Sequence, residues 1–254
     1  MEKIMIKRLT LALGLVSASV FANSTVGELS EIPDSENIKN KGFHGHVGLA
    51  AASLAEYVGS DDNESRVLPL INVNYNDRLY FKYNRLGAWL FKSDSNFRVG
   101  ALVSPHRGID EDDLPNRFDG YGDRDPSIMA GFNMGFNKGR FRAEMAALKD
   151  VSDNSEGTKL QAQIGYTFLA NEHYTLSASA KVESLDDDMV GYYYESFESA
   201  TNYSVSLIGT YRLSPKWTLM GAVSTTSLDD EISDSDIVDD DTPTMALIGA
   251  TYSF

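Results

Sequence analysis

The chain has 254 residues, no cysteine and a formal net charge of −15 at pH 7. This acidic balance argues against nucleic acid as a partner and against a basic patch that would bind anionic lipid. Without disulfides, an exported protein of this sequence must be stabilised by a packed core or by closure of a barrel. The length suits one domain of medium size.

The first 22 residues have the pattern of a secretory signal peptide. Basic residues precede an apolar run from Leu9 to Val20, and Val20-Phe-Ala22 supplies the small residue of a cleavage site. The run is shorter than the ~20 residues of a membrane-spanning helix, and a lipoprotein would need a cysteine to acylate. We therefore expect residues 1–22 to be removed, which changes the net charge from −15 to −17.

Residues 23–42 are polar and acidic, with Pro33 and no periodicity, which predicts a flexible periplasmic arm. From Phe43 onward, apolar and polar residues alternate, so residues 43–254 are expected to form an all-β domain. The alternating segments are 43–57, 66–76, 78–92, 96–104, 127–137, 140–149, 158–168, 174–185, 201–213, 217–228 and 243–254.

The turns favour a transmembrane antiparallel barrel over a soluble β-sandwich. Short and long connections take turns along the chain, as they do in membrane barrels, whose periplasmic turns are short and outer loops long. The short turns are 92–96, 137–139, 169–173 and 214–216, and the long loops are 104–125, 150–157, 186–200 and 229–242.

Aromatic residues gather beside the short turns. Such a ring is favoured at a membrane–water interface, whereas a sandwich gives no reason for aromatics to mark one end. The residues are Phe91, Phe97, Phe136, Phe141, Phe168, Tyr174, Tyr211, Trp217, Tyr252 and Phe254.

The number of strands must be even if both chain ends lie in the periplasm. The eleven alternating segments become twelve strands if Arg78–Phe91 is two short strands around Asn84–Gly87. We therefore predict twelve strands, with ten as the alternative if one early segment does not span.

Several short motifs, in order, resemble the MipA/OmpV family of outer-membrane proteins. The segment Arg85-Leu-Gly-Ala-Trp-Leu90 lacks a glycine that the family has between Arg and Leu. The other matching segments are Glu56-Tyr-Val-Gly-Ser-Asp-Asp62, Arg66-Val-Leu-Pro-Leu70, Gly120-Tyr-Gly-Asp123, Tyr211-Arg-Leu-Ser-Pro-Lys-Trp217 and Tyr252-Ser-Phe254. The ending on Phe254 also resembles the closing strand of bacterial outer-membrane barrels.

The resemblance implies localisation in the outer membrane of a Gram-negative cell and a non-enzymatic role. It implies a scaffold for peptidoglycan synthesis that bridges a lytic transglycosylase and a penicillin-binding protein. Other members are linked to osmolarity, stress or adhesion. No family motif is tied to a defined site, so the resemblance assigns no catalytic, cofactor or metal residue.

Acidic clusters in the predicted outer loops are candidate cation ligands, since carboxylates suit Ca²⁺. None has the spacing of an EF-hand, and solvated surface or contact with the cations that bridge lipopolysaccharide explains them equally. The clusters are Asp110–Asp113, Asp186–Asp188, Asp229–Glu231 and Asp239–Asp241.

The four histidines offer a weaker case for catalysis. His44 and His46 share one face of a strand, whereas His106 stands apart and His173 lies in a short turn. A lipid-modifying barrel would need an oriented base and a nucleophile or activated water, and no local motif supplies them. An enzyme is therefore the third alternative.

The predicted lumen carries both signs of charge. Opposite charges in a narrow barrel form a satisfied plug or line a path for small solutes, so a porin is the main alternative to a scaffold. The inward set is Arg98, Arg140, Arg142, Glu144, Gln161, Gln163, Lys181, Glu183 and Arg212. The run Tyr192–Tyr194 with Phe197 is open to two interpretations, an external contact or a cover over the barrel mouth.

Overall fold

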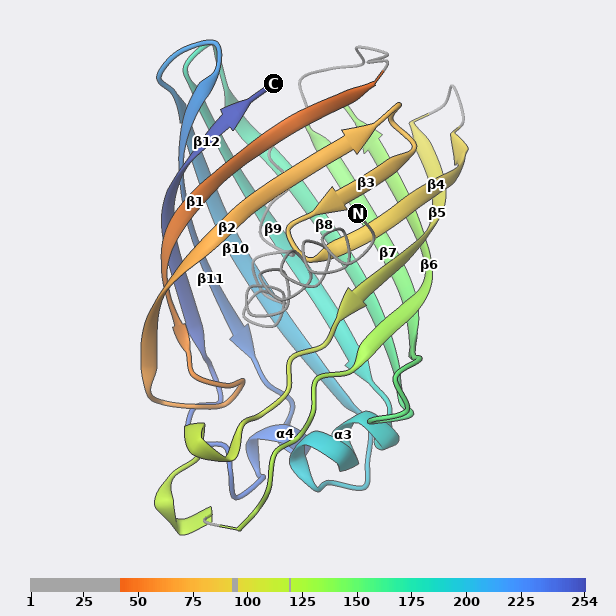
Figure 1. Ribbon diagram of the computed structural model, residues 1–254, viewed down its shortest axis with the longest axis vertical. Coiled ribbons are helices and arrows are strands. Elements are labelled where there is room, and N and C mark those ends of the chain that lie inside the picture. Colours follow the sequence, from red (N-terminus) through yellow and green to blue (C-terminus); the bar gives the residue numbers. More distant parts are fainter. Residues whose placement is uncertain (1–41, 93–95, 119) are drawn as a thin grey trace, which may run out of the picture.

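The computed structural model describes residues 42–92, 96–118 and 120–254. The predicted signal peptide and all but the last residue of the predicted arm lie outside these ranges. Twelve antiparallel strands of the described chain close into one barrel, each paired with its sequence neighbours and β12 with β1 (Figure 1). The strands are β1 (Phe43–Ala55), β2 (Asn63–Tyr75), β3 (Leu79–Lys82), β4 (Arg85–Lys92), β5 (Phe97–Pro105), β6 (Ile128–Lys138), β7 (Phe141–Asp150), β8 (Thr158–Ala170), β9 (Tyr174–Leu185), β10 (Ala200–Arg212), β11 (Trp217–Ser227) and β12 (Thr244–Ser253).

The prediction of a transmembrane barrel with twelve strands is confirmed. The segment 78–92 does contain two strands, β3 and β4, but the turn between them is Tyr83–Asn84, so Gly87 lies inside β4. A side chain at Gly87 would overlap the ring of Tyr80, since a Cβ there would lie 2.2 Å from the Tyr80 hydroxyl oxygen. The glycine therefore lets the two arms of this short hairpin pack closely.

Barrel closure joins the two ends of the folded chain. β1 and β12 pair from His46 with Ser253 to Ser53 with Ala246. The terminal Phe254 donates its backbone N–H to the Gly45 carbonyl (3.1 Å) and accepts from the Gly45 N–H (3.3 Å). The last residue is thus held in the wall rather than frayed.

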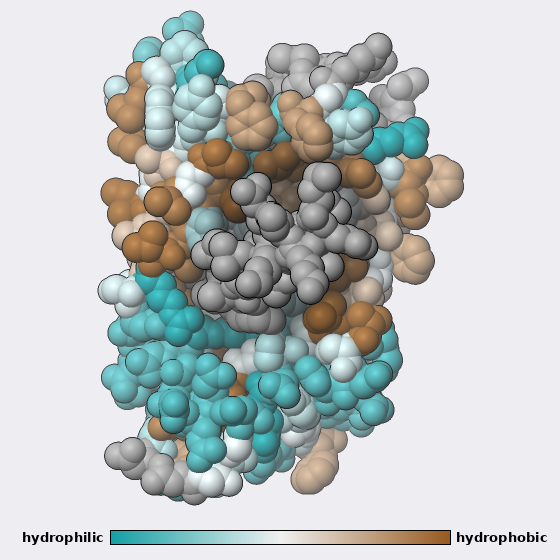
Figure 2. All heavy atoms as spheres, viewed as in Figure 1, coloured by the Kyte–Doolittle hydropathy of each residue, from teal (hydrophilic) through white to brown (hydrophobic). Residues whose placement is uncertain are grey.

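Alternation sorts the side chains of each strand into an outer and a lumen face. The outer face is apolar, and Figure 2 shows it as a brown band between polar ends. The predicted aromatic ring is confirmed beside the short turns, where Phe43 and Tyr75 join it with ring centroids 4.7 Å apart. Trp217 and Tyr252 (5.3 Å) and Tyr174 and Tyr211 (5.0 Å) also touch.

The two ends of the barrel differ in construction. The short-turn end has connections of a few residues and both ends of the barrel sequence. The long-loop end holds four short helices, η2 (Glu111–Asp113), η3 (Asn116–Phe118), α3 (Asp187–Tyr194) and α4 (Asp230–Ser233). Among the described residues, no helix is long and apolar enough to cross a bilayer.

Asp150, the last residue of β7, organises the loop that follows it. Its carboxylate accepts hydrogen bonds from the backbone N–H groups of Ser152 (2.8 Å), Ser155 (2.7 Å) and Glu156 (3.1 Å). It also accepts from the hydroxyls of Ser152 (2.6 Å), Ser155 (2.9 Å) and Ser127 (2.9 Å). One carboxylate therefore satisfies donors on both sides of the β7–β8 loop.

Replacing Asp150 with alanine should destabilise the fold by about 2–4 kcal/mol, because buried donors lose charged acceptors. Unfolding of the vesicle-inserted protein in urea measures the loss, and proteolysis of loop 151–157 should quicken in parallel. Asp153→Asn, at an exposed position of the same loop, is the control and should match the parent protein. Equal stability of the Asp150 and Asp153 variants would contradict this role.

Candidate functional site

Charged and polar side chains of β4, β7, β8 and β9 meet in the lumen. Glu183 lies at their centre, where its carboxylate accepts from Gln161 Nε2 (2.5 Å) and pairs with Lys181 (3.4 Å) and Lys159 (4.0 Å). Arg85 extends the network from β4, since it reaches Glu144 (3.4 Å) and the Gln161 side-chain oxygen (3.2 Å). The network fixes long side chains against the wall by pairing opposite charges.

This polar wall carries more positive than negative charge, although the whole chain is strongly acidic. On the described lumen faces of β4 to β9, cations outnumber carboxylates. The cations are Arg85, Arg98, Arg142, Lys159 and Lys181, and the carboxylates are Glu144, Asp150 and Glu183. This wall therefore has a positive electrostatic potential.

A pocket opens beside the network, toward the short-turn end. Its lining combines apolar groups, among them Ala143, Ala178 and Ile208, with polar side chains. The polar side chains are Arg142, Glu144, Gln163, Thr167, Ser177 and Ser179. These side chains offer hydrogen-bond donors, hydrogen-bond acceptors and the guanidinium of Arg142, which suit a small polar solute.

The opposite wall of the lumen is apolar. It is formed by buried side chains of β1, β2 and β10 to β12, together with Tyr83 at the tip of the β3–β4 hairpin. The members are Ala50, Ala52, Leu54, Leu68, Leu70, Tyr83, Ile208, Met220, Ala222, Met245 and Leu247. The lumen is thus amphipathic in cross-section, polar on β4 to β9 and apolar across from them.

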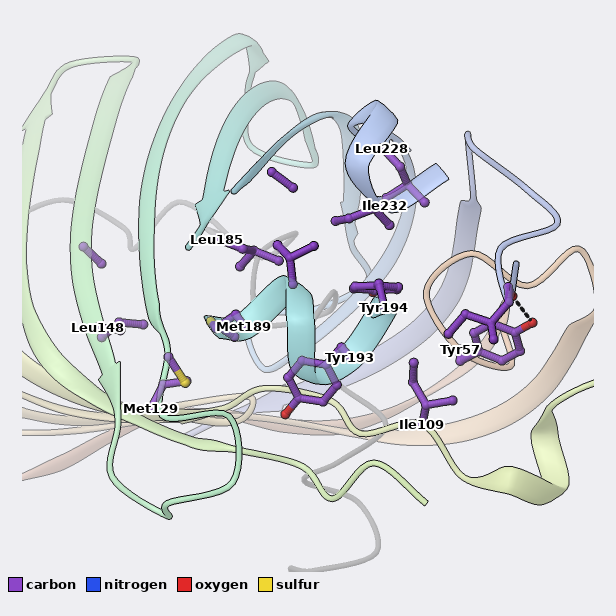
Figure 3. Close-up of a cluster of buried hydrophobic side chains, with 14 of the residues drawn as sticks. Tyr57, Ile109, Met129, Leu148, Leu185, Met189, Tyr193, Tyr194, Leu228 and Ile232 are labelled. Carbon is purple, nitrogen blue, oxygen red and sulfur yellow. Dashed lines mark hydrogen bonds between the residues drawn. The ribbon is translucent and has the colours of Figure 1, made fainter. Parts of the chain in front are cut away.

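The long loops fold over the barrel mouth and pack into a hydrophobic core, which we call the cap. Figure 3 shows α3 directing Met189, Tyr193 and Tyr194 toward side chains of the strand ends and of α4. The cap core consists of Tyr57, Leu102, Ile109, Leu114, Met129, Ala146, Leu148, Leu185, Met189, Val190, Tyr193, Tyr194, Ala200, Leu228, Ile232 and Ile237. Of the two interpretations of the tyrosine run, the cover over the mouth is therefore correct, while Phe197 is 91% exposed.

Polar contacts tie distant loops together within the cap. The Tyr57 hydroxyl donates to the Ile237 carbonyl (2.7 Å, Figure 3), and burial, with Asp239 nearby, raises the pKa of Tyr57 to about 12. Arg117 pairs with Asp239 (2.7 Å) and Arg124 with Glu195 (2.9 Å). The described part of the mouth is covered by a structured assembly rather than by independent loops.

The sequence of the barrel matches a known protein family. The model of the family described as MltA-interacting protein MipA matches residues 47–254, nearly the whole barrel. This chain belongs to the MipA family. No curated protein matches it in sequence.

The solved structures that this MipA-family barrel resembles are also membrane barrels. An outer membrane channel from Pseudomonas putida F1 is 11% identical with a TM-score of 0.48, covering 89% of this chain and 100% of that one. The NanC porin is 12% identical with a TM-score of 0.45, covering 82% and 100%. The translocator domain of the autotransporter NalP from Neisseria meningitidis is 12% identical with a TM-score of 0.42, covering 93% and 100%. Likenesses this distant carry no statement about what the MipA-family chain binds.

The acidic clusters have structural partners in this MipA-family barrel. Asp186 is the N-cap of α3, where it accepts from the Met189 N–H (3.2 Å), and it also accepts from the Thr158 N–H (2.7 Å). Asp229 caps α4 by accepting from the Glu231 N–H (3.1 Å). Such caps satisfy the free N–H groups of a first turn. Within the described residues, no three acidic or histidine side chains converge as metal ligands would.

The histidines are spread over the barrel. His44 and His46 share the lumen face near the short-turn end, as predicted, and His44 pairs with Asp77 (3.0 Å). His106 lies in the cap at the opposite end, and His173 lies on the surface against Tyr211, with ring centroids 6.5 Å apart. The structure therefore does not bring the four histidines together into one site.

The inward polar set needs two corrections and two additions. Arg140 lies in the β6–β7 turn and donates to the Phe168 carbonyl (3.1 Å), so it is outside the lumen. Arg212 is exposed at the end of β10. Lys159 and Arg85 were missed, although Lys159 could have been found because it alternates with the outward Leu160. Arg85 gave no such signal, because the bounds of β3 and β4 were uncertain.

His106 is a part-buried group whose charge state depends on the folded cap. It accepts a hydrogen bond from Lys159 Nζ at Nδ1 (3.3 Å) and packs on the Tyr193 ring, with centroids 4.7 Å apart. Burial, reinforced by the Lys159 cation, lowers the pKa of His106 from 6.5 to about 3. The imidazole is therefore neutral in the folded cap at physiological pH.

Because the folded pKa lies below the unfolded one, the stability of the cap should fall as pH drops from about 6.5 toward 3. Proteolysis of the long loops at a series of pH values measures this effect. His106→Gln keeps an acceptor for Lys159 and removes the titration, so its loops should lose less protection on acidification. An identical pH profile in the two proteins would contradict the role of His106.

Proposed function

We propose that this MipA-family protein is a non-catalytic interaction protein of the Gram-negative outer membrane. Its short-turn end would face the periplasm and bind a lytic transglycosylase, with a penicillin-binding protein as a further partner in peptidoglycan synthesis. The family description, MltA-interacting protein, supports the partner class. The short turns at this end support the orientation, because the periplasmic turns of such barrels are short and the outer loops long.

The charge on the short-turn end carries the proposal in physical terms. Basic side chains dominate the exposed surface there, against Asp77 and Glu172. They are Arg78, Lys138, Arg140, Arg212 and Lys216. The long-loop end, by contrast, holds the acidic clusters. Electrostatic attraction would steer a periplasmic partner with an acidic patch to the basic end and orient that patch toward the short turns.

Reversing two charges at this end should weaken the complex. Lys138→Glu with Lys216→Glu, in different turns, should raise the Kd for a purified lytic transglycosylase by roughly tenfold, since two exposed charges at about 0.7 kcal/mol each give about 1.4 kcal/mol. Binding of the partner to the barrel in lipid nanodiscs measures the effect, which should shrink at high salt.

The matched control reverses two exposed charges at the opposite end, Asp61→Lys with Glu198→Lys. It should leave the Kd unchanged if the partner binds the short turns. Tighter binding by this control, comparable in size to the weakening by the first double variant, would mean that only net charge matters. Absence of any complex with the parent protein would refute the proposed interaction.

A second candidate function is favoured by the cationic excess of the lumen wall, namely passage of small anions. The cap covers the described mouth, so we expect the intact barrel to be electrically silent in planar bilayers. Replacing residues 187–198 with a short Gly-Ser linker should produce stepwise, anion-selective currents. Phe197→Ser, which leaves the cap core intact, is the control and should stay silent, and a silent but folded deletion variant would contradict an anion path.

A further inference from the structure

Within the described residues, the barrel wall has a break in its strand pairing between β2 and the β3–β4 hairpin. β2 pairs with β1 along its whole length, from Asn63 to Tyr75, but with β3 only from Asn72 to Tyr75. On the other side of the hairpin, β4 and β5 pair no further than Leu86 with Val103. Within the described residues, nothing else pairs with the free edge of Asn63–Leu70. Figure 1 shows the short β3–β4 hairpin ending part-way along the wall beside the long β2.

Both strands that flank this break carry a proline on the facing edge. Ile71 offers its carbonyl to the Tyr83 N–H (2.6 Å), so Pro69, two residues earlier, directs its nitrogen to the same side. His106 donates its N–H to Ser127 beside β6 (2.7 Å), so the preceding Pro105 directs its nitrogen away from β6, toward the break. Neither nitrogen can donate to an added strand.

The break has a defined frame, which we call the window. Tyr83 closes it on the side of the short turns. At the long-loop end Arg107 spans from β5 to β1 and β2, where it donates to the Ala55 carbonyl (3.0 Å) and pairs with Glu64 (3.5 Å). The window is thus bounded on four sides by β2, the hairpin tip, the end of β5 and Arg107.

Apolar side chains border the window on both faces of the wall. Outside it, Val67 is 70% exposed and Leu86 and Val103 also face outward, which places the window in the apolar band. Inside it, Leu68 and Leu70 belong to the apolar wall of the lumen, while Arg66 and Glu64 of the same face pair with each other nearer the long loops. The window therefore joins an apolar lumen surface to the hydrocarbon of the leaflet nearest the long loops.

We propose that the window admits the acyl chain of an outer-leaflet amphiphile from the bilayer to the apolar wall of the lumen. The two prolines oppose a polypeptide strand as the occupant, and the apolar borders match an alkyl chain. The backbone of Ser65 and Val67 points to the break and needs hydrogen-bond partners in a membrane, which the ester or amide of an acyl lipid supplies. The cap covers the described part of the mouth, and the window opens sideways toward the outer leaflet.

Lipid quenching of single tryptophans tests the window in the full-length barrel. In a Trp89→Phe, Trp217→Phe background, Leu70→Trp places a reporter inside the window. The protein is folded into vesicles of phosphatidylcholine with brominated acyl chains. Leu70→Trp should lose nearly as much fluorescence as Val67→Trp, which faces the bilayer directly.

Ala222→Trp is the matched control, since it lies on the same apolar wall but in β11, whose neighbours β10 and β12 are paired along the strand. It should be quenched several-fold less than Leu70→Trp. Equal quenching of the two lumen reporters would overturn the proposal, as would no quenching at Leu70→Trp. Quenching at neither Leu70→Trp nor Val67→Trp would reveal a polypeptide cover and would also overturn it.

Lengthening both arms of the β3–β4 hairpin beyond Tyr83–Asn84 should extend pairing along β2 and abolish quenching at Leu70→Trp. Persistent quenching in that folded variant would show that lipid reaches the lumen elsewhere and would refute the window. Leu68→Trp serves as the reporter if Leu70→Trp fails to fold. The retarded band of unfolded barrels in gel electrophoresis identifies such failures.

Discussion

Backbone pairing in the absence of water is the constraint on which this structure depends. In a bilayer, each N–H and C=O of a spanning segment needs a partner inside the protein, and a sheet meets that need only by closing on itself. The pairing of β1 with β12 closes it here, and the mutual hydrogen bonds of Gly45 and Phe254 continue the pairing to the last residue. Closure also explains the even strand number, since the two ends can meet only on one side of the membrane. The free edge of Asn63–Leu70 is an exception in this wall, because the other described strands pair with both neighbours along most of their length.

The lumen shows how one barrel combines two environments. Glu183 pairs with Lys181 and Lys159 on the polar wall, and this pairing offsets the cost of placing charged groups inside the barrel. The apolar wall faces them across the lumen. The charge network lies on β4 and β7 to β9, whereas the buried apolar cluster lies on β1, β2 and β10 to β12, where buried polar residues such as Asn72 and Ser204 accompany it. A molecule with a polar and an apolar part would find a complementary surface for each.

Sequence patterns predicted the barrel better than its interior. The strands, the aromatic ring and the division of Arg78–Phe91 depend on alternation between near neighbours, which a sequence displays directly. The cap depends on contacts such as Tyr57 with Ile237, which lie 180 positions apart, so local patterns left the role of Tyr192–Tyr194 open. The alternation of β7 predicts that Arg140 faces the lumen, but Arg140 lies in the β6–β7 turn, one residue before β7 begins. Asp186 and Asp229 were interpreted as loop charge, although an acidic residue before a helical turn is also an N-cap.

The cap also has a consequence for the order of assembly. Its core joins side chains from the first loop of the barrel to the last, and neither they nor their partners are near one another until the sheet has curled round. Contacts with such long sequence separation form late, because the entropy of the intervening chain must be lost first. Each loop must therefore cross the membrane as an extended segment and find its place afterwards. Resistance of the cap to proteolysis would accordingly show that insertion is complete. A protease added at intervals during biogenesis could measure when the cap forms.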